Sequence, residues 1–112
     1  MTISIARDFS VIPGARFPEE GDFSGRDFRN NVLCPALRKA IANNEVLTVV
    51  LDGTAGLGTS FLEESFGGLI RHDEFPLETL QRFINFVSNE DPDYITEINQ
   101  YMKEANAQSS KK

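Results

Sequence analysis

The sequence is organised around one short apolar run that ends in a glycine-rich loop. Residues 46–51 are nearly all β-branched or aliphatic, which is typical of a central strand with both faces buried. Asp52 and Gly53 end this run and begin a loop that also contains Gly56 and Gly58. Because such a strand needs helices on both sides, the run predicts an α/β fold in which this strand is parallel to its neighbours.

Two elements are expected before this run. Residues 2–5 alternate polar and apolar side chains, and residues 13–14 are Pro-Gly, so we expect a strand and a hairpin that returns beside it. A helix is expected over residues 24–43, with Ser24 in the capping position. Pro35 lies inside this helix and removes a main-chain hydrogen bond, which predicts a kink or a break nearby.

Three elements are expected after the glycine-rich loop. A helix is predicted to begin at Ser60, which is spaced for a capping box with Glu63. A strand is expected over residues 80–87, and a final helix over residues 91–105. Residues 106–112 are polar and unpatterned, and we expect them to form a flexible tail. The sequence therefore predicts a single domain over residues 1–105.

Charge and cysteine content exclude several functions. The net charge of −6 repels phosphate backbones and anionic lipids, so neither nucleic acid nor membrane is an expected partner. Cys34 is the only cysteine, which excludes an intrachain disulfide and favours a buried small side chain. Without a signal peptide in residues 1–25 or an 18-residue apolar stretch, we expect a soluble, cytoplasmic protein. His72 is expected to end a helix, not to bind a metal.

The loop at residues 52–60 has more than one interpretation. In the simplest, its glycines only make a turn and Ser60 caps the next helix. In the second, the glycines and the helix start hold the phosphate of a nucleotide or another cofactor. The loop lacks a Walker signature, and no acidic residue follows in a convincing dinucleotide-binding context. A structural homodimer that associates through its helices is a further alternative.

The third interpretation of the loop rests on resemblance. The sequence contains Leu51-Asp52-Gly53, the run Gly58-Thr59-Ser60-Phe61-Leu62-Glu63-Glu64, and Phe66-Gly67-Gly68-Leu69. Together with residues 13–17 and 23–28, these motifs resemble the STAS-like domain family of unknown function over roughly residues 9–105. The resemblance implies an α/β, STAS-like fold, with a mixed, mostly parallel sheet of about four strands and helices packed against it.

The resemblance also implies a function. Well-known STAS domains are anti-sigma factor antagonists, which bind a kinase-like anti-sigma factor and are switched by phosphorylation of a serine after a central strand. Thr59 and Ser60 occupy the corresponding place, although the usual Asp-Ser-Ser-Gly-Leu-Gly pattern is replaced. The resemblance thus implies a non-enzymatic regulatory module without a cofactor, whose partner is a histidine-kinase-type ATPase or another signalling protein. The expected partner-binding residues are Asp52, Gly53, Gly56, Gly58, Phe61, Glu63, Glu64, Gly67 and Gly68.

Charged and glycine residues in the two helices suggest further expectations. Adjacent Glu63 and Glu64 point about 100 degrees apart on a helix, so a solvated face is expected instead of a catalytic pair. Each of Gly67 and Gly68 destabilises a helix by about 1 kcal/mol relative to alanine, which predicts close packing against the sheet or a partner. Arg29 belongs to a scattered set of basic residues that we expect to serve only solubility.

Overall fold

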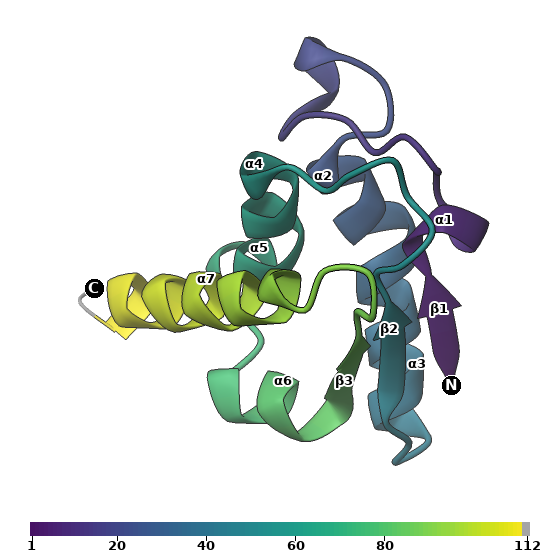
Figure 1. Cartoon of the computed structure of the whole chain (residues 1–112). Helices are drawn as coiled ribbons and strands as arrows, with labels where there is room; N and C mark the ends of the chain where they lie inside the picture. The colour runs from purple at the N-terminus through teal and green to yellow at the C-terminus, as the bar shows by residue number, and fades with distance from the viewer. Residues whose placement is uncertain (111–112) are drawn as a thin grey trace.

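Three parallel strands form one sheet, with most of the helices to one side of it (Figure 1). A computed structural model describes residues 1–110 of the chain. The strands are β1 (Thr2–Ser4), β2 (Leu47–Val50) and β3 (Ile84–Val87), and they are hydrogen-bonded in the order β1-β2-β3. Both pairs are parallel. The predicted central parallel strand is confirmed, but residues 1–110 contain three strands, not about four, and the sheet is not mixed.

The two faces of the sheet are unequally covered. On β2, Leu47 and Val49 are fully buried and belong to the core cluster, whereas Thr48 and Val50 are only half-buried. The prediction that residues 46–51 are buried on both faces is therefore wrong. Successive strand residues point to opposite faces, and the hydrophobic core lies against only one of them.

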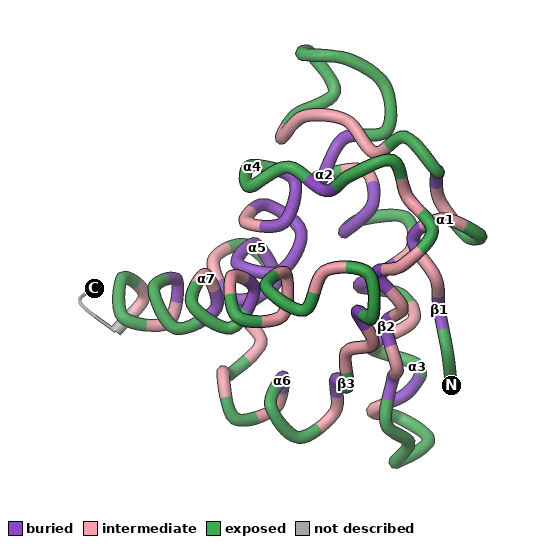
Figure 2. The backbone as a smooth tube through the Cα atoms, viewed as in Figure 1, coloured by how far each residue is buried: buried purple, intermediate pink, exposed green. Residues whose placement is uncertain are grey.

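The amino-terminal hairpin does not form. β1 ends at Ser4, whose hydroxyl accepts a hydrogen bond from the Arg7 N–H (3.2 Å) and caps α1 (Ile5–Asp8). The connection from α1 to α2 contains one short 3₁₀ turn, η1 (Pro18–Glu20), and is largely exposed (Figure 2). This connection does not join the sheet. It folds back on itself, and its Gly14 N–H donates a hydrogen bond to the Phe23 carbonyl (2.8 Å).

The first long helix is built from three consecutive segments. They are α2 (Gly25–Phe28), the π-helical segment η2 (Arg29–Leu33) and α3 (Cys34–Ala42). The Ser24 hydroxyl accepts a hydrogen bond from the Asp27 N–H (3.1 Å), so the predicted cap is confirmed. The irregularity expected near Pro35 is confirmed as well, because the wider π-helical turn ends at Leu33, two residues before it.

The second long helix has the same three-part construction. It comprises α4 (Thr59–Leu62), the π-helical segment η3 (Glu63–Gly67) and α5 (Gly68–Arg71), and His72 ends it as predicted. The predicted capping role of Ser60 is wrong. Gly58 occupies the N-cap position with an extended backbone, no side chain caps the helix, and Ser60 is already its second residue.

The carboxyl-terminal part holds α6 (Leu77–Phe83), β3 and α7 (Asp93–Ser110). The strand predicted over residues 80–87 begins only at Ile84, because a helix that starts after Pro76 continues to Phe83. The final helix extends beyond residue 105, so residues 106–110 are helical, and Lys111 and Lys112 lie outside the described residues. Within residues 1–110, no helix is both long and apolar enough to cross a membrane.

Phenylalanine and aliphatic side chains fill the core. Phe28, Phe61 and Phe66 are among the largest fully buried side chains. Phe28 and Phe61 come from the two long helices and stack with their ring centroids 5.7 Å apart. Cys34 is a buried, free thiol, as its sequence context predicts. Burial of these rings holds the two long helices together behind the loop that follows β2.

Candidate functional site

The loop between β2 and α4 is anchored at its base by Asp52. One carboxylate oxygen accepts a hydrogen bond from the Glu90 N–H (2.8 Å), and the other accepts one from the Asn89 N–H (3.0 Å). These main-chain donors lower the pKa of Asp52. In return, the Gly53 N–H donates to the Glu90 carboxylate (2.6 Å). Asp52 therefore ties the end of β2 to the connection between β3 and α7.

The middle of the loop is held on both sides. The Ala55 N–H donates to the Val11 carbonyl (2.7 Å) in the α1–α2 connection. The Leu57 N–H donates to the Tyr94 hydroxyl (3.1 Å) on α7. Together with Gly53, three main-chain N–H groups of the loop thus have protein acceptors. A nucleotide-binding loop needs such groups free to surround a phosphate, so this geometry disfavours the nucleotide interpretation.

The loop and the neighbouring connection share one exposed surface. Val11 is 56% exposed and Ile12 is 61% exposed, and both are far more exposed than an apolar core residue. Thr59 and Ser60 are exposed at the start of α4. We name the exposed residues here the β2–α4 surface: Val11, Ile12, Gly53, Ala55, Gly56, Gly58, Thr59 and Ser60. Paired apolar side chains beside a fixed backbone are typical of a protein contact site.

Only part of the predicted partner-binding set lies on the β2–α4 surface. Phe61 has no exposed area and packs on other phenylalanines, and Glu64 is 2% exposed. Gly67 and Gly68 are buried, and Asp52 is turned toward the β3–α7 connection. Of the remaining members, Gly53, Gly56 and Gly58 lie beside the predicted phosphorylation sites Thr59 and Ser60. Glu63 is half-buried and is paired with arginines.

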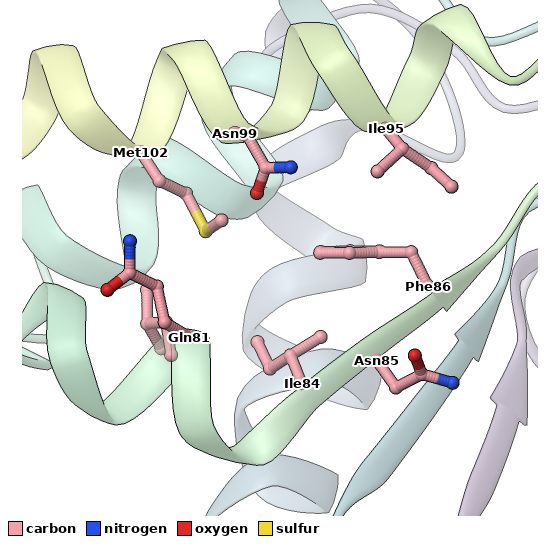
Figure 3. A pocket seen from close by; sticks show the side chains of 8 residues that line it. Gln81, Ile84, Asn85, Phe86, Ile95, Asn99 and Met102 are labelled. Carbon is pink, nitrogen blue, oxygen red and sulfur yellow. The ribbon is translucent and has the colours of Figure 1, made fainter.

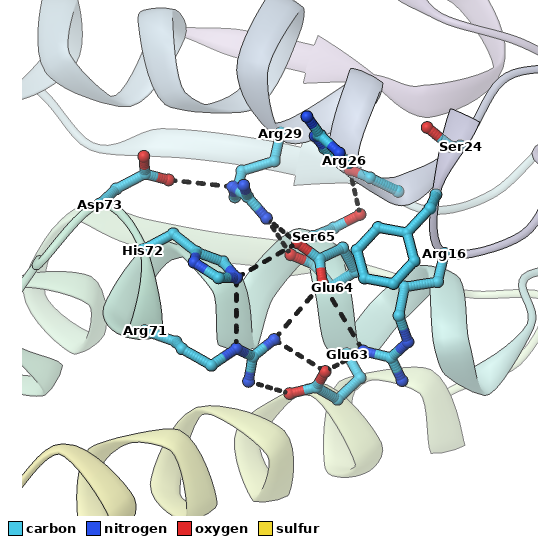
Figure 4. A network of polar contacts seen from close by, with 12 residues as sticks. Arg16, Ser24, Arg26, Arg29, Glu63, Glu64, Ser65, Arg71, His72 and Asp73 are labelled. Atoms are coloured by element: carbon cyan, nitrogen blue, oxygen red, sulfur yellow. Dashed lines mark hydrogen bonds and ion pairs between the residues drawn. The ribbon is translucent and has the colours of Figure 1, made fainter. Parts of the chain in front are cut away.

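A network of ion pairs surrounds Glu63 and Glu64, which follow the β2–α4 surface along the chain (Figure 4). Glu64 pairs with Arg29, and both side chains are almost completely buried. Arg29 also approaches Asp73, with Nε and Oδ2 separated by 3.1 Å in an ion pair that lacks good hydrogen-bond alignment. Arg29 further donates to the Glu64 main-chain carbonyl (2.9 Å). The expectation that Arg29 serves only solubility is therefore wrong.

Glu63 forms the more accessible half of the same network. It accepts hydrogen bonds from Arg16 in the α1–α2 connection and from Arg71 at the end of α5. Burial raises the pKa of Glu63, but the hydrogen bonds from Arg71 and Arg16 outweigh it and hold the pKa below its ordinary value. The predicted solvated face for Glu63 and Glu64 is thus wrong, because three arginines from separate segments converge on these carboxylates.

Two glycines make room for this network. A Cβ at Gly68 would overlap the Arg29 guanidinium, and one at Gly67 would lie 2.5 Å from Glu63 Oε2. The expected close packing of these glycines is confirmed, but their neighbours are charged side chains and not the sheet. In the sequence, the sign of a large neighbouring side chain is the glycine pair inside a helix. That neighbour includes Arg29, which directly follows the buried Phe28.

No metal-binding cluster is present in the part of the chain that the structure describes: no three His, Cys, Asp or Glu side chains are suitably grouped there. His72 approaches Glu64, with Nε2 3.8 Å from Oε2, at the edge of the ion network. The sequence prediction for His72 was a helix-end position, and the structure places it there.

Comparison with known proteins identifies the family. A family model described as the STAS-like domain of unknown function matches residues 24–94, which is more than half of the chain. The match contains the first long helix, β2, the loop, the second long helix and β3. No curated protein and no solved structure matched the chain. On the strength of the family match, the chain belongs to the family of STAS-like domains of unknown function.

Proposed function

We propose that this chain is a non-enzymatic regulatory module that binds a protein partner through the β2–α4 surface. The observation that carries the proposal is the position of Val11 and Ile12, both exposed, against a loop whose backbone is fixed by hydrogen bonds. A fixed loop loses little conformational freedom on binding, and exposed apolar side chains supply area to bury. STAS-like membership makes an anti-sigma antagonist-like role the natural comparison.

The proposed switch is phosphorylation of Ser60, or of Thr59 beside it. A phosphate adds about −1.5 to −2 charges at pH 7, and Ser60 lies three residues before Glu63 on the same helical face. Arg16 already pairs with Glu63, so a phosphate on Ser60 would compete for Arg16 while repelling Glu63. Because Arg16 belongs to the same connection as Val11 and Ile12, the modification would disturb the apolar part of the surface.

The proposed partner is a histidine-kinase-type ATPase or a related regulator. A pull-down from the native host, read by mass spectrometry, tests this with wild type, Ile12→Glu and Val46→Glu side by side. Val46 is the matched control, because it is an apolar residue, 49% exposed, that directly precedes β2, whereas the loop follows β2. We expect Ile12→Glu to lose a partner that Val46→Glu retains.

The phosphorylation step has its own comparison in the same assay. Ser60→Asp is expected to weaken partner binding, whereas Ser60→Ala should bind as wild type does. A partner retained equally by wild type, Ile12→Glu and Ser60→Asp would contradict the proposed surface. Saturable nucleotide binding would instead support the cofactor alternative, and a mass that rises with protein concentration would support the homodimer alternative.

A further inference from the structure

The outer edge of β3 is not paired with another strand. β3 is the last strand in the order β1-β2-β3, and the Val87 carbonyl accepts a hydrogen bond from the Leu51 N–H (2.8 Å). Main-chain groups of alternate residues point to opposite edges of a parallel strand, so those of Phe86 face away from β2. Within residues 1–110 no strand lies on that side. Such an edge is a template for an added strand.

A groove of about 250 Å³ runs beside β3, between α6 and α7 (Figure 3). Its apolar lining comes from Leu80, Ile84, Phe86, Ile95 and Met102, and its polar lining comes from Gln81, Asn85 and Asn99. None of these side chains is charged, although the chain contains 17 acidic and 11 basic residues. The groove is smaller than the roughly 300–1,000 Å³ of common small-molecule pockets, so it suits one or two inserted side chains.

The polar lining selects the chemistry of the occupant. A carboxamide both donates and accepts hydrogen bonds, as the peptide group of a main chain does. A charged side chain entering the groove would lose water without gaining an opposite charge. The groove therefore favours a neutral main chain with apolar side chains over an ionic ligand.

We propose that the groove binds an extended, uncharged peptide segment of another protein, which adds to β3 as a fourth strand. Its main chain pairs with the N–H and the carbonyl of Phe86, and an apolar side chain enters between Ile95 and Met102. This is β-strand addition to a sheet edge. A second copy of this folded chain is a poorer occupant, because α6 and α7 wall the groove on both sides and would collide with the helices of that copy.

This contact is independent of the β2–α4 surface. The β2–α4 surface lies beyond the carboxyl end of β2 (Figure 1), whereas the groove is lined by residues of α6, β3 and α7. A peptide in the groove and a partner at the loop therefore need different residues. Failure of one proposal leaves the other standing.

The test begins with a displayed library of random octapeptides selected on the full chain. We expect the enriched peptides to be uncharged, with apolar residues at alternate positions. Asn99 is an exposed residue of the groove lining, so a bound apolar peptide would have to cover a lysine at this position and remove water from its charge. The affinity of the peptides, measured by fluorescence anisotropy, should therefore fall about tenfold or more with Asn99→Lys. Gln100→Lys is the matched control, since it makes the same change at the next exposed residue of α7, outside the groove lining.

Nuclear magnetic resonance locates the bound peptide. The Phe86 amide signal should shift, and its hydrogen exchange should slow as the new main-chain bond forms. The proposal is overturned if no uncharged peptide is enriched, if Asn99→Lys and Gln100→Lys bind equally well, or if the shifts fall on residues 53–60. A dimer that Asn99→Lys disperses in sedimentation would assign the groove to a second copy and would also overturn it.

Discussion

Replacing Gly68 by alanine tests whether the buried ion network depends on a missing side chain. The added Cβ would overlap Nη1 of Arg29 and lie 3.0 Å from its Cδ and Cζ. Arg29 cannot turn aside freely, because Glu64 and Asp73 hold it and only 5% of the residue is exposed. The substitution should therefore force the buried pair between Arg29 and Glu64 apart.

Two opposing contributions set the size of the effect. Alanine stabilises a helix by about 1 kcal/mol relative to glycine, whereas breaking a buried ion pair costs about 3–5 kcal/mol. The expected net loss in the free energy of unfolding is about 2–4 kcal/mol, out of the roughly 5–15 kcal/mol typical of a domain. In an Arg29→Ala, Glu64→Gln background the Nη1, Cδ and Cζ atoms that would meet the added Cβ are gone, and Gly68→Ala should stabilise by about 1 kcal/mol.

Urea unfolding followed by circular dichroism measures both effects. With a slope of about 2 kcal/mol per molar urea, the middle of the usual range of about 1–3, Gly68→Ala should lower the midpoint by about 1–2 M. Gly58→Ala is the matched control, because Gly58 has φ −72° and no neighbour within 4 Å of an added Cβ, and its effect should stay within about 0.5 kcal/mol. Equal destabilisation by Gly68→Ala in both backgrounds, or none in the wild type, would refute the reasoning.

Three further predictions concern the second helix and the loop. Gly58→Ser should raise the free energy of unfolding by a few tenths of a kcal/mol to about 1 kcal/mol, because serine supplies the cap that α4 lacks; an unchanged urea midpoint would contradict this. The arginine partners lower the pKa of Glu63 in the folded protein from its ordinary 4.5. The ionised Glu63 therefore stabilises the folded state above about pH 4.5, and this stabilisation is lost as the pH falls through the lowered pKa. Glu63→Gln should therefore flatten the acid dependence of urea unfolding below about pH 5, and a dependence as steep as in wild type would refute it. The Asn89 and Glu90 amides donate hydrogen bonds to the Asp52 carboxylate, so Asp52→Ala should speed hydrogen exchange at both amides. The Leu51 amide in the sheet should exchange as before.

Several features of the fold could be predicted because their causes are local. The run at residues 46–51 produced a central parallel strand, and Ser24 capped the first long helix, as its spacing from Asp27 indicates. The final helix begins near Asp91, whose carboxylate accepts a hydrogen bond from the Asp93 N–H (3.1 Å). The family resemblance also rests on contiguous motifs, and the family match confirms it.

Other features required the folded chain. Residues 2–5 have the pattern of a first hairpin strand, but Ser4 instead caps a short helix. Its hydroxyl accepts a hydrogen bond from the Arg7 N–H, three residues later. The apolar residues of segment 80–87 occur at spacings that suit either a strand or a helix, and burial of Leu80 accompanies the helix over its first part. In both segments the local pattern permits two structures, and contacts made after folding select one.

The glycine-rich loop was identifiable from sequence, whereas its exposed face and the ion network that follows it along the chain were not. Its glycines and its position after a buried strand indicated a functional surface, but Val11 and Ile12 reach that surface from about forty residues earlier, through a hydrogen bond with Ala55. Arg29 and Glu64 are 35 residues apart in the chain. Sequence spacing shows which charges share a helical face, but whether a charge is buried and paired depends on segments that meet only in the tertiary structure.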